Sequence, residues 1–248
     1  MDARVVLPMQ FLRSRRCLFI FHTAMEAMAA DEMSSSKCSV HKENGCRTLK
    51  LSDGNMLENL NKYKVILASN SPRRNELLSN LGIRYEVKTL PDIDESFPEG
   101  LSEVETAAYI ARAKADAYRG VMLADELIIT ADTIVWLDGE VMGKPCDEGD
   151  ARRMLRALSG KTHQVITGVC LTTLESQKAF ATVTDVTFAT LSEEEIAYYV
   201  ERYRPMDKAG SYGIQEWIGF VGVENISGSY FNVMGLPIQR LYTELKKI

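Results

Sequence analysis

From about residue 63 to the end of the chain, apolar segments typical of strands alternate with amphipathic segments typical of helices. This alternation favours an α/β domain, because each helix and sheet must bury one apolar face against another element. We expect helices over residues 72–81, 102–119, 150–158 and 192–204, and a last one opened by Pro237. We expect strands over residues 65–68, 85–88, 126–130, 133–137, 164–173 and 179–189, the last two paired with each other.

The first sixty residues lack this pattern, so we predict a disordered extension over 1–60 and a folded domain over 61–248. Residues 17–21 form an apolar patch that is far too short to span a bilayer. Cys38, His41 and Cys46 suggest a metal knuckle, but a fourth ligand is missing and the spacing fits no common zinc pattern. A tail without a metal is the preferred interpretation.

Composition narrows the class of protein. Hydrophobic residues make up 46% of the 248 residues and charged residues 25%, as in ordinary globular proteins. The net charge of −5 gives no support for a nucleic-acid partner, and no segment predicts a membrane span. Five scattered cysteines do not resemble a disulfide framework, so a cytoplasmic location is expected.

The segment from Lys64 to Leu78 carries the strongest local signal. An apolar run suited to a buried strand ends in a small polar turn, where Ser71 can cap a helix that Pro72 opens. Arg73 and Arg74 add two positive charges to the free N–H groups of that helix start. The combination predicts an anion site, and phosphate is the anion that such a site favours. A solvated basic helix face is the alternative.

Other polar residues qualify as site candidates to different degrees. Asp132 lies inside an apolar strand, where a charge is costly unless it is paired or bound to a metal, so it favours a functional role. The loop acids near Glu95 are most simply solvated, Lys144 fits a turn, and Gln215 is ambiguous. His163 could act as a base, although a lone histidine at a strand start is more often structural.

Taken together, these residues fit phosphate chemistry on a soluble substrate. Arginines and a helix start would hold a polyphosphate, carboxylates would hold a divalent cation, and a lysine would neutralise developing charge. The residues do not identify the bond that breaks.

A series of motifs resembles the Maf family of nucleoside triphosphate pyrophosphatases, in the family's order and spacing from about Tyr63 to the C-terminus. The motifs are Ser69-Asn70-Ser71-Pro72-Arg73-Arg74, Asp94-Glu95, Ala131-Asp132-Thr133, Gly143-Lys144-Pro145, Asp207-Lys208-Ala209-Gly210, Ile214-Gln215 and Gly235-Leu236-Pro237. The resemblance implies a two-lobed α/β fold of the Maf/ITPase-like type, with a mixed sheet and an active-site cleft between the lobes.

The resemblance also implies a reaction and a set of roles. The reaction is hydrolysis of a nucleoside triphosphate to the monophosphate and diphosphate, assisted by a divalent metal, Mg²⁺ or Mn²⁺. The implied catalytic residues are Asp132, Lys144 and Glu95, the implied metal ligands are Asp132 and Glu95, and the implied substrate-binding residues are Ser69, Arg73, Arg74, Thr133 and Gln215. Asp132 is either the base that activates water or mainly a metal ligand.

Three positions separate the branches of the family. Arg73, Thr133 and Gln215 match the dTTP/UTP branch, whereas the sister branch associated with 7-methyl-GTP carries tryptophan, glutamine and glutamate there. The main hypothesis is a housecleaning enzyme that removes non-standard nucleotides and also acts on dTTP and UTP. A 7-methyl-GTP pyrophosphatase and a non-catalytic nucleotide-binding regulator of septum formation are the alternatives. The family is often dimeric, and a homodimer is left open.

Overall fold

The computed structural model describes residues 56–248. Most of the predicted 1–60 extension, including Cys38, His41 and Cys46, lies outside the described residues. Its last part does not: Leu57 and Leu60 are buried in the core, so the folded domain includes residues before position 61. No helix in the described range is long and apolar enough to cross a membrane.

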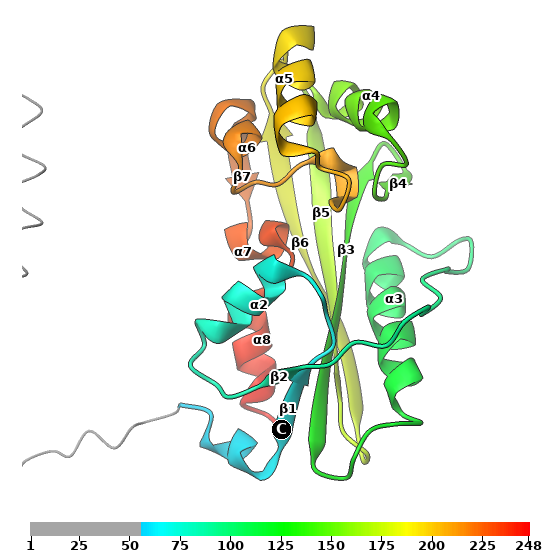
Figure 1. Ribbon diagram of the computed structural model, residues 1–248, viewed down its shortest axis with the longest axis vertical. Helices are drawn as coiled ribbons and strands as arrows, with labels where there is room; N and C mark the ends of the chain where they lie inside the picture. Colours follow the sequence, from blue (N-terminus) through cyan, green and yellow to red (C-terminus); the bar gives the residue numbers. More distant parts are fainter. Residues whose placement is uncertain (1–55) are drawn as a thin grey trace, which may run out of the picture. The chain divides into compact units, whose positions relative to one another are not determined.

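The described residues form a mixed α/β structure, which confirms the predicted fold class (Figure 1). Its strands are β1 (Lys64–Leu67), β2 (Glu86–Val87), β3 (Glu126–Leu137), β4 (Glu140–Met142), β5 (Thr162–Thr172), β6 (Gln177–Phe188) and β7 (Val223–Ser227). Its helices are η1 (Glu58–Lys62), α2 (Pro72–Ser79), α3 (Glu103–Tyr118), α4 (Glu148–Leu158), α5 (Glu193–Tyr203), η2 (Ala209–Ser211), α6 (Trp217–Gly222), α7 (Tyr230–Met234) and α8 (Ile238–Leu245).

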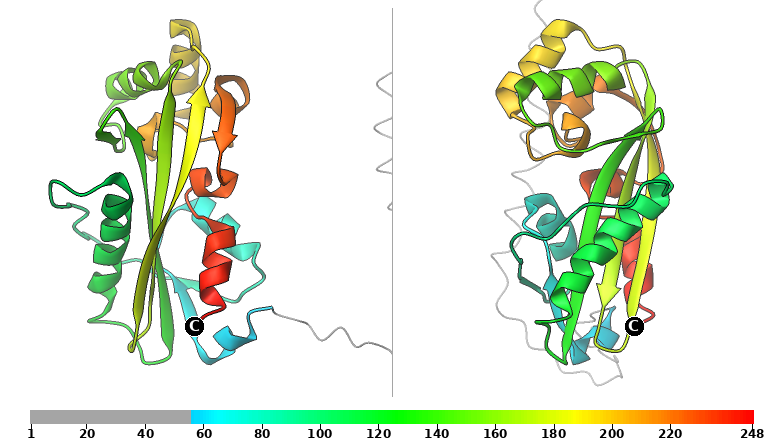
Figure 2. Two further views of the ribbon diagram at one scale, coloured as in Figure 1. Left: turned by 180° about the vertical axis from the view of Figure 1, so that it is seen from behind. Right: turned by 90° about the vertical axis from the view of Figure 1, so that its right-hand side faces the viewer.

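The seven strands make one sheet in the order β2-β1-β3-β5-β6-β7, with β4 attached to β3. The first three strands of that order are parallel, and the pairs from β3 to β7 are antiparallel. The long strands β3, β5 and β6 run the length of the domain and connect its two ends (Figures 1 and 2). The predicted mixed sheet is therefore present.

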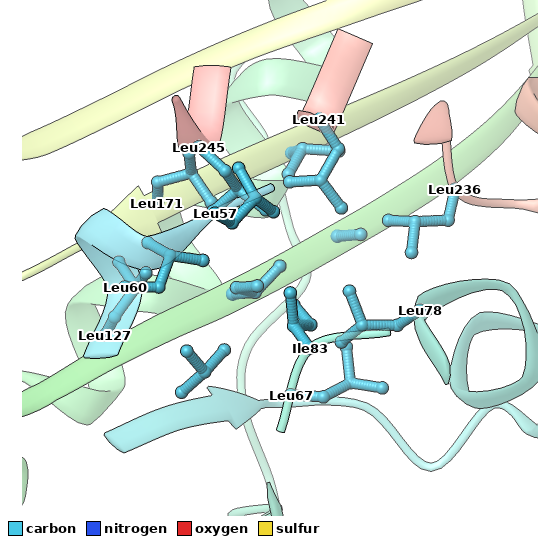
Figure 3. Close-up of a cluster of buried hydrophobic side chains, with 14 of the residues drawn as sticks. Leu57, Leu60, Leu67, Leu78, Ile83, Leu127, Leu171, Leu236, Leu241 and Leu245 are labelled. Carbon is cyan, nitrogen blue, oxygen red and sulfur yellow. The ribbon is translucent and has the colours of Figure 1, made fainter. Parts of the chain in front are cut away.

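One face of the sheet carries two separate apolar cores. Alternate residues of β3 point to this face. Leu127, Ile129 and Ala131 join the core at one end, and Val135 and Leu137 join the core at the other. The first core contains leucines from η1, α2 and α8 (Figure 3), and the second is built with α4, α5 and α6.

A polar step separates the two cores. Thr133 lies between Ala131 and Val135 on β3, and its register partner Thr167 occupies the same position on β5. Their hydroxyl oxygens are 3.0 Å apart, and the Thr167 hydroxyl donates to the carbonyl of Asn232. Because no apolar side chain from these two strands fills this step, the cores stay distinct, and the two lobes implied by the resemblance follow from the sequence of β3 and β5.

The opposite face of the sheet is covered by α3, which lies close to it (Figure 2). Small residues at Ala107, Ala111 and Ala115 face the sheet, and all three are fully buried. Gly168 allows this approach, since a Cβ at that position would lie 2.0 Å from the carbonyl oxygen of Ala107. The Thr130 hydroxyl fixes the helix further by donating to the Ala111 carbonyl at 2.6 Å.

The β3 strand is continuous from Glu126 to Leu137, whereas the sequence suggested two segments around Asp132. Its outer edge, however, is only partly covered. The β1 strand pairs with residues 126–129 and β4 pairs with residues 135–137. Among the described strands, none pairs with residues 130–134 on that side. The chain therefore leaves a gap of open strand edge with Asp132 at its centre.

Candidate active site

A cavity of about 730 Å³ surrounds this open edge of β3 and reaches both lobes. All eight residues predicted as catalytic, metal-binding or substrate-binding line it: Ser69, Arg73, Arg74, Glu95, Asp132, Thr133, Lys144 and Gln215. The structure thus brings together side chains that are as many as 146 positions apart in sequence, from Ser69 to Gln215.

Asp132 is paired with a lysine that the sequence analysis did not single out. The Nζ atom of Lys114 lies 2.6 Å from Asp132 Oδ1 and 2.9 Å from Glu95 Oε1. The side chains of Asp132 and Lys114 are only 13% and 14% exposed, whereas Glu95 is 53% exposed. Asp132 Oδ2 accepts no hydrogen bond within the described residues, so this oxygen is available to a water molecule or a ligand.

The position of Lys114 on α3 explains why it reaches Asp132. It follows Ile110 and Ala111 by one helical turn, on the buried side of the helix. Ala111 is held against β3 by Thr130, two residues before Asp132, so the next turn of the helix lies beside Asp132. A lysine within a run of buried alanines was the sequence signal for this residue.

Arg74 binds the open edge of β3 instead of lying free in the cavity. Its Nη1 donates to the Ala131 carbonyl at 2.8 Å, its Nη2 to Thr133 Oγ1 at 3.0 Å, and its Nε to the Gly235 carbonyl at 2.8 Å. A longer bond of 3.4 Å joins Nη1 to Ser69 Oγ. Burial lowers the pKa of Arg74, and the nearby charge of Asp132 acts in the opposite direction. One N–H of the guanidinium remains for a ligand.

The Ser71 cap and Pro72 place these arginines as predicted. Ser71 Oγ accepts a bond from the backbone N–H of Arg74, and α2 begins at Pro72. Gly235, which accepts from Arg74, ends α7 with a φ of 113°, a conformation that favours glycine. The basic turn is therefore fastened to the end of α7 through the side chain of Arg74.

Arg73, the neighbouring arginine, has an acidic partner from the other lobe. Its Nη1 lies 3.1 Å from Asp207 Oδ2. The second oxygen of Asp207 lies 2.7 Å from Nζ of Lys208, which is nearly buried and lies 3.1 Å from Glu216. Burial alone would raise the pKa of Asp207, but the hydrogen bonds from Lys208 and Arg73 hold it below its ordinary value.

The far wall of the cavity holds Lys144 and Gln215. Lys144 is exposed and makes no hydrogen bond or ion pair with the described residues, and its neighbour Gly143 accepts a backbone bond from Gly210. The amide oxygen Oε1 of Gln215 is buried and also lacks a partner in the described part of the chain. Both groups are positioned to meet a ligand.

His163 does not belong to the site. It is 1% exposed, its Nε2 lies 2.7 Å from the Tyr212 hydroxyl, and it does not line the cavity. Burial lowers its pKa to about 4. The structural interpretation of this histidine is therefore correct. Among five aromatic residues in the C-terminal part of the chain that could stack on a base, Tyr212 lines the cavity, whereas Trp217, Phe220, Tyr230 and Phe231 do not.

The donor set for a metal consists of two carboxylates, Asp132 and Glu95, that approach the same ammonium group. No cluster of three or more acidic, histidine or cysteine side chains suited to a metal occurs within residues 56–248. Two carboxylates fit Mg²⁺ or Mn²⁺ held jointly with substrate phosphates, since these ions are usually bound by one or two carboxylates and phosphate oxygens. They do not fit a cage made of protein ligands alone.

The described residues thus define an α/β protein whose mixed sheet leaves one strand edge open, with an acid at the centre of this edge and cations in the cavity around it. The family model for Maf-like proteins matches residues 64–248. A dTTP/UTP pyrophosphatase from Phocaeicola vulgatus is 74% identical over 193 residues, covering 78% of this chain and 100% of the relative. Proteins of the same name from Bacteroides fragilis and Porphyromonas gingivalis are 67% and 58% identical over 193 residues, covering 78% and 77% of this chain and 100% and 97% of their own length. The chain belongs to the Maf family.

Among solved structures, a HAM1 protein from Coxiella burnetii is 18% identical, with a TM-score of 0.41 over 75% of this chain and 100% of that one.

Proposed function

We propose that this chain hydrolyses dTTP and UTP, and modified nucleotides of similar shape, to the nucleoside monophosphate and diphosphate. The observation that carries the proposal is the carboxylate of Asp132, which stands in the open edge of β3 with Oδ2 unpartnered and cations on several sides. Curated relatives of 58–74% identity are named dTTP/UTP pyrophosphatase, which supports the same substrate class.

Asp132 is proposed as the base that activates the attacking water. Lys114 engages Oδ1 and fixes the carboxylate, which leaves Oδ2 to accept a proton from water. The oxygen of that water adds to the α-phosphorus, the bond from this phosphorus to the oxygen that bridges it to the β-phosphorus breaks, and the diphosphate leaves with the bonding electrons. If Asp132 is mainly a metal ligand, another group must accept the proton.

The triphosphate is proposed to lie between the lobes. Ser69, Arg73 and the N-terminus of α2 would contact it on one side, and Lys144 on the other, where it would offset charge that develops on the leaving oxygens. Arg74 would contribute its remaining N–H while its other donors hold the edge of β3. This division explains how adjacent arginines serve one site without competing for one phosphate.

A divalent cation, Mg²⁺ or Mn²⁺, is proposed to be held by Asp132 and Glu95 together with the substrate. When bound, such an ion supplies charge neutralisation at the phosphoryl oxygens. Lys114 contacts both carboxylates, so it keeps the two acids together and reduces their mutual repulsion.

The base is proposed to be recognised by Gln215 and Thr133. An amide both donates and accepts, which suits the imide edge of thymine or uracil. The unpartnered Oε1 of Gln215 would accept the imide N–H, and leaving such a buried acceptor unpaired is costly. A cytoplasmic housecleaning role, which keeps non-standard nucleotides out of nucleic acids, and a homodimeric state are parts of the same proposal.

The test is a nucleotide panel with identification of products. Purified full-length protein with Mg²⁺ or Mn²⁺ is expected to release diphosphate from dTTP and UTP, and Asp132→Asn is expected to lower kcat by about 10²–10⁴-fold. Asp138→Asn removes an equal charge outside the cavity and serves as the matched control.

Three outcomes would contradict the proposal. Release of single orthophosphates would refute the reaction class. A higher kcat/KM for 7-methyl-GTP than for dTTP and UTP would assign the chain to the sister branch. Tight nucleotide binding without turnover under either metal would favour a regulator.

A further inference from the structure

The ion pair between Arg73 and Asp207 joins the two lobes across the mouth of the cleft. Arg73 lies on α2, whose Leu77 and Leu78 belong to the core of one lobe. Asp207 lies between α5 and η2, where Met206 and Ala209 pack against the core of the other. Figure 1 shows α2 in the half of the domain that contains α8, and the chain after α5 in the half that contains α4. Both charged residues line the cavity.

Five cations line this cavity within the described residues: Arg73, Arg74, Lys114, Lys144 and Lys208. They differ in how firmly they are engaged. Arg74 is bonded to neutral acceptors that hold β3, and Lys114 is shared by two carboxylates. Lys208 is nearly buried between Asp207 and Glu216. Lys144 has no partner in the described chain.

Arg73 is the one among them whose only ionic partner is a half-exposed carboxylate. Its side chain is 23% exposed and that of Asp207 is 59% exposed. The contact uses a single Nη1–Oδ2 bond of 3.1 Å, whereas a guanidinium can form two parallel bonds with a phosphate. A phosphate can therefore replace Asp207 on Arg73 with a gain in hydrogen bonds.

Asp207 would not be left without a partner after this exchange. Its other oxygen lies 2.7 Å from Nζ of Lys208, and Lys208 is held in turn by Glu216. Glu216 accepts a hydrogen bond from Tyr199, whose hydroxyl also accepts the backbone N–H of Gly213, two residues before Gln215. The Asp207 carboxylate is thus held in place by Lys208, and it can release Arg73 while it keeps this lysine as a partner.

We propose that Asp207 is a built-in competitor for Arg73: it occupies this arginine in the free enzyme, is displaced by the substrate phosphates, and re-forms the pair when diphosphate leaves. This inference rests on the proposed function. Asp207 acts through Arg73, so it is a positioning residue that sets how tightly the cleft retains phosphate anions.

The inference is tested by binding of inorganic tripolyphosphate to the full chain, measured by titration calorimetry with and without Mg²⁺. Because exposed ion pairs contribute about 0.2–1 kcal/mol, Asp207→Asn is expected to tighten binding by about 1.4- to fivefold. The KM for dTTP should fall by a similar factor. Structural damage would weaken binding, so tightening separates the two explanations. Asp138→Asn, which breaks an exposed pair with Lys161 outside the cavity, should leave binding unchanged.

A second comparison shows whether the effect passes through Arg73. In an Arg73→Gln background, Asp207→Asn should change tripolyphosphate binding by less than the single variant does. An equal effect in both backgrounds would overturn the proposal, as would unchanged or weaker binding by Asp207→Asn. Weaker binding only with Mg²⁺ would instead identify Asp207 as a metal ligand. If the wild-type chain does not bind tripolyphosphate, the phosphate cleft itself is wrong; if it binds but Asp207→Asn has no effect, only this inference fails.

Discussion

The pairing of Asp132 with Lys114 makes a quantitative prediction about folding. The two side chains are 13% and 14% exposed, and their charged atoms are 2.6 Å apart. Replacing Lys114 by Met removes the ammonium group and leaves a carboxylate within an apolar strand. Breaking a buried ion pair from one side costs about 3–5 kcal/mol. Because some water reaches both groups here, we expect Lys114→Met to lower the free energy of unfolding by about 2–3 kcal/mol.

The reverse change should cost less. In Asp132→Asn, the lysine keeps Glu95 as a partner at 2.9 Å, and that carboxylate is half-exposed. No unpaired charge is left, so we expect a loss of about 1 kcal/mol. The double variant lacks both charges and should be more stable than Lys114→Met alone, with a coupling free energy of about 1–2 kcal/mol.

Urea unfolding at neutral pH, followed by tryptophan fluorescence, gives all four free energies of this cycle. Lys161→Met is the matched control, since Lys161 pairs with Asp138 at 2.8 Å but both side chains are largely exposed. Its effect should stay below about 1 kcal/mol. The reasoning fails if Lys114→Met is no more destabilising than Asp132→Asn, or if the second substitution restores no stability.

Two further predictions concern residues outside the cavity. Burial lowers the pKa of His163 from 6.5 to about 4, so the unfolded chain binds a proton between these values that the folded chain does not. The free energy of unfolding is therefore unaffected by this group above pH 6.5 and falls by about 3 kcal/mol as the pH drops to 4. His163→Leu should remove this pH dependence from the free energies measured by urea unfolding. An unchanged pH dependence would refute the buried, neutral state of His163. Gly168→Ala would place a Cβ 2.0 Å from the Ala107 carbonyl and should push α3 away from the sheet. We expect a loss of at least about 2 kcal/mol together with lower activity, because Lys114 moves with the helix, and a fully active, equally stable variant would contradict this packing.

The sequence predicts those parts of the fold that local chemistry determines. Ser102 and Ser192 form capping boxes with Glu105 and Glu195, and α3 and α5 begin at the next residue, in agreement with the helices expected over 102–119 and 192–204. The Asp138-Gly139 turn connects β3 to β4. In each case the signal lies within a few residues, so no long-range contact is needed to interpret it.

The short elements between residues 217 and 234 were not predicted. The helices α6 and α7 contain six and five residues, too few to show a helical period, and β7 has only five. They form because β7 pairs with β6 and because Asn232 donates to the Val165 carbonyl of β5. Those partners are tens of residues away, so the local sequence does not indicate them.

In the candidate site, too, the residues with a local signal were predicted and those that depend on distant contacts were not. Asp132 was identified because a charge inside an apolar strand needs a partner, but the partner itself was missed. Lys114 is 18 residues away, and which side of its helix packs against the sheet is not known until the fold is seen. Asp207 and Lys208 belonged to a recognised motif, yet their link to Arg73 became visible only when the two lobes were seen together.

The open edge of β3 connects these observations. A carboxylate inside a fully paired sheet would be shut off from water, whereas one at an ordinary sheet edge would not be flanked by two lobes. Because β1 stops at Leu67 and β4 starts its pairing only at Val135, Asp132 is reachable although its strand is long and central. The carbonyl of Ala131 would then lack a strand partner, and Arg74 supplies the missing donor. The gap that leaves Asp132 reachable therefore also requires a donor from outside the sheet. Arg74 is that donor and is needed for the fold, whereas Arg73 remains free to exchange Asp207 for a phosphate.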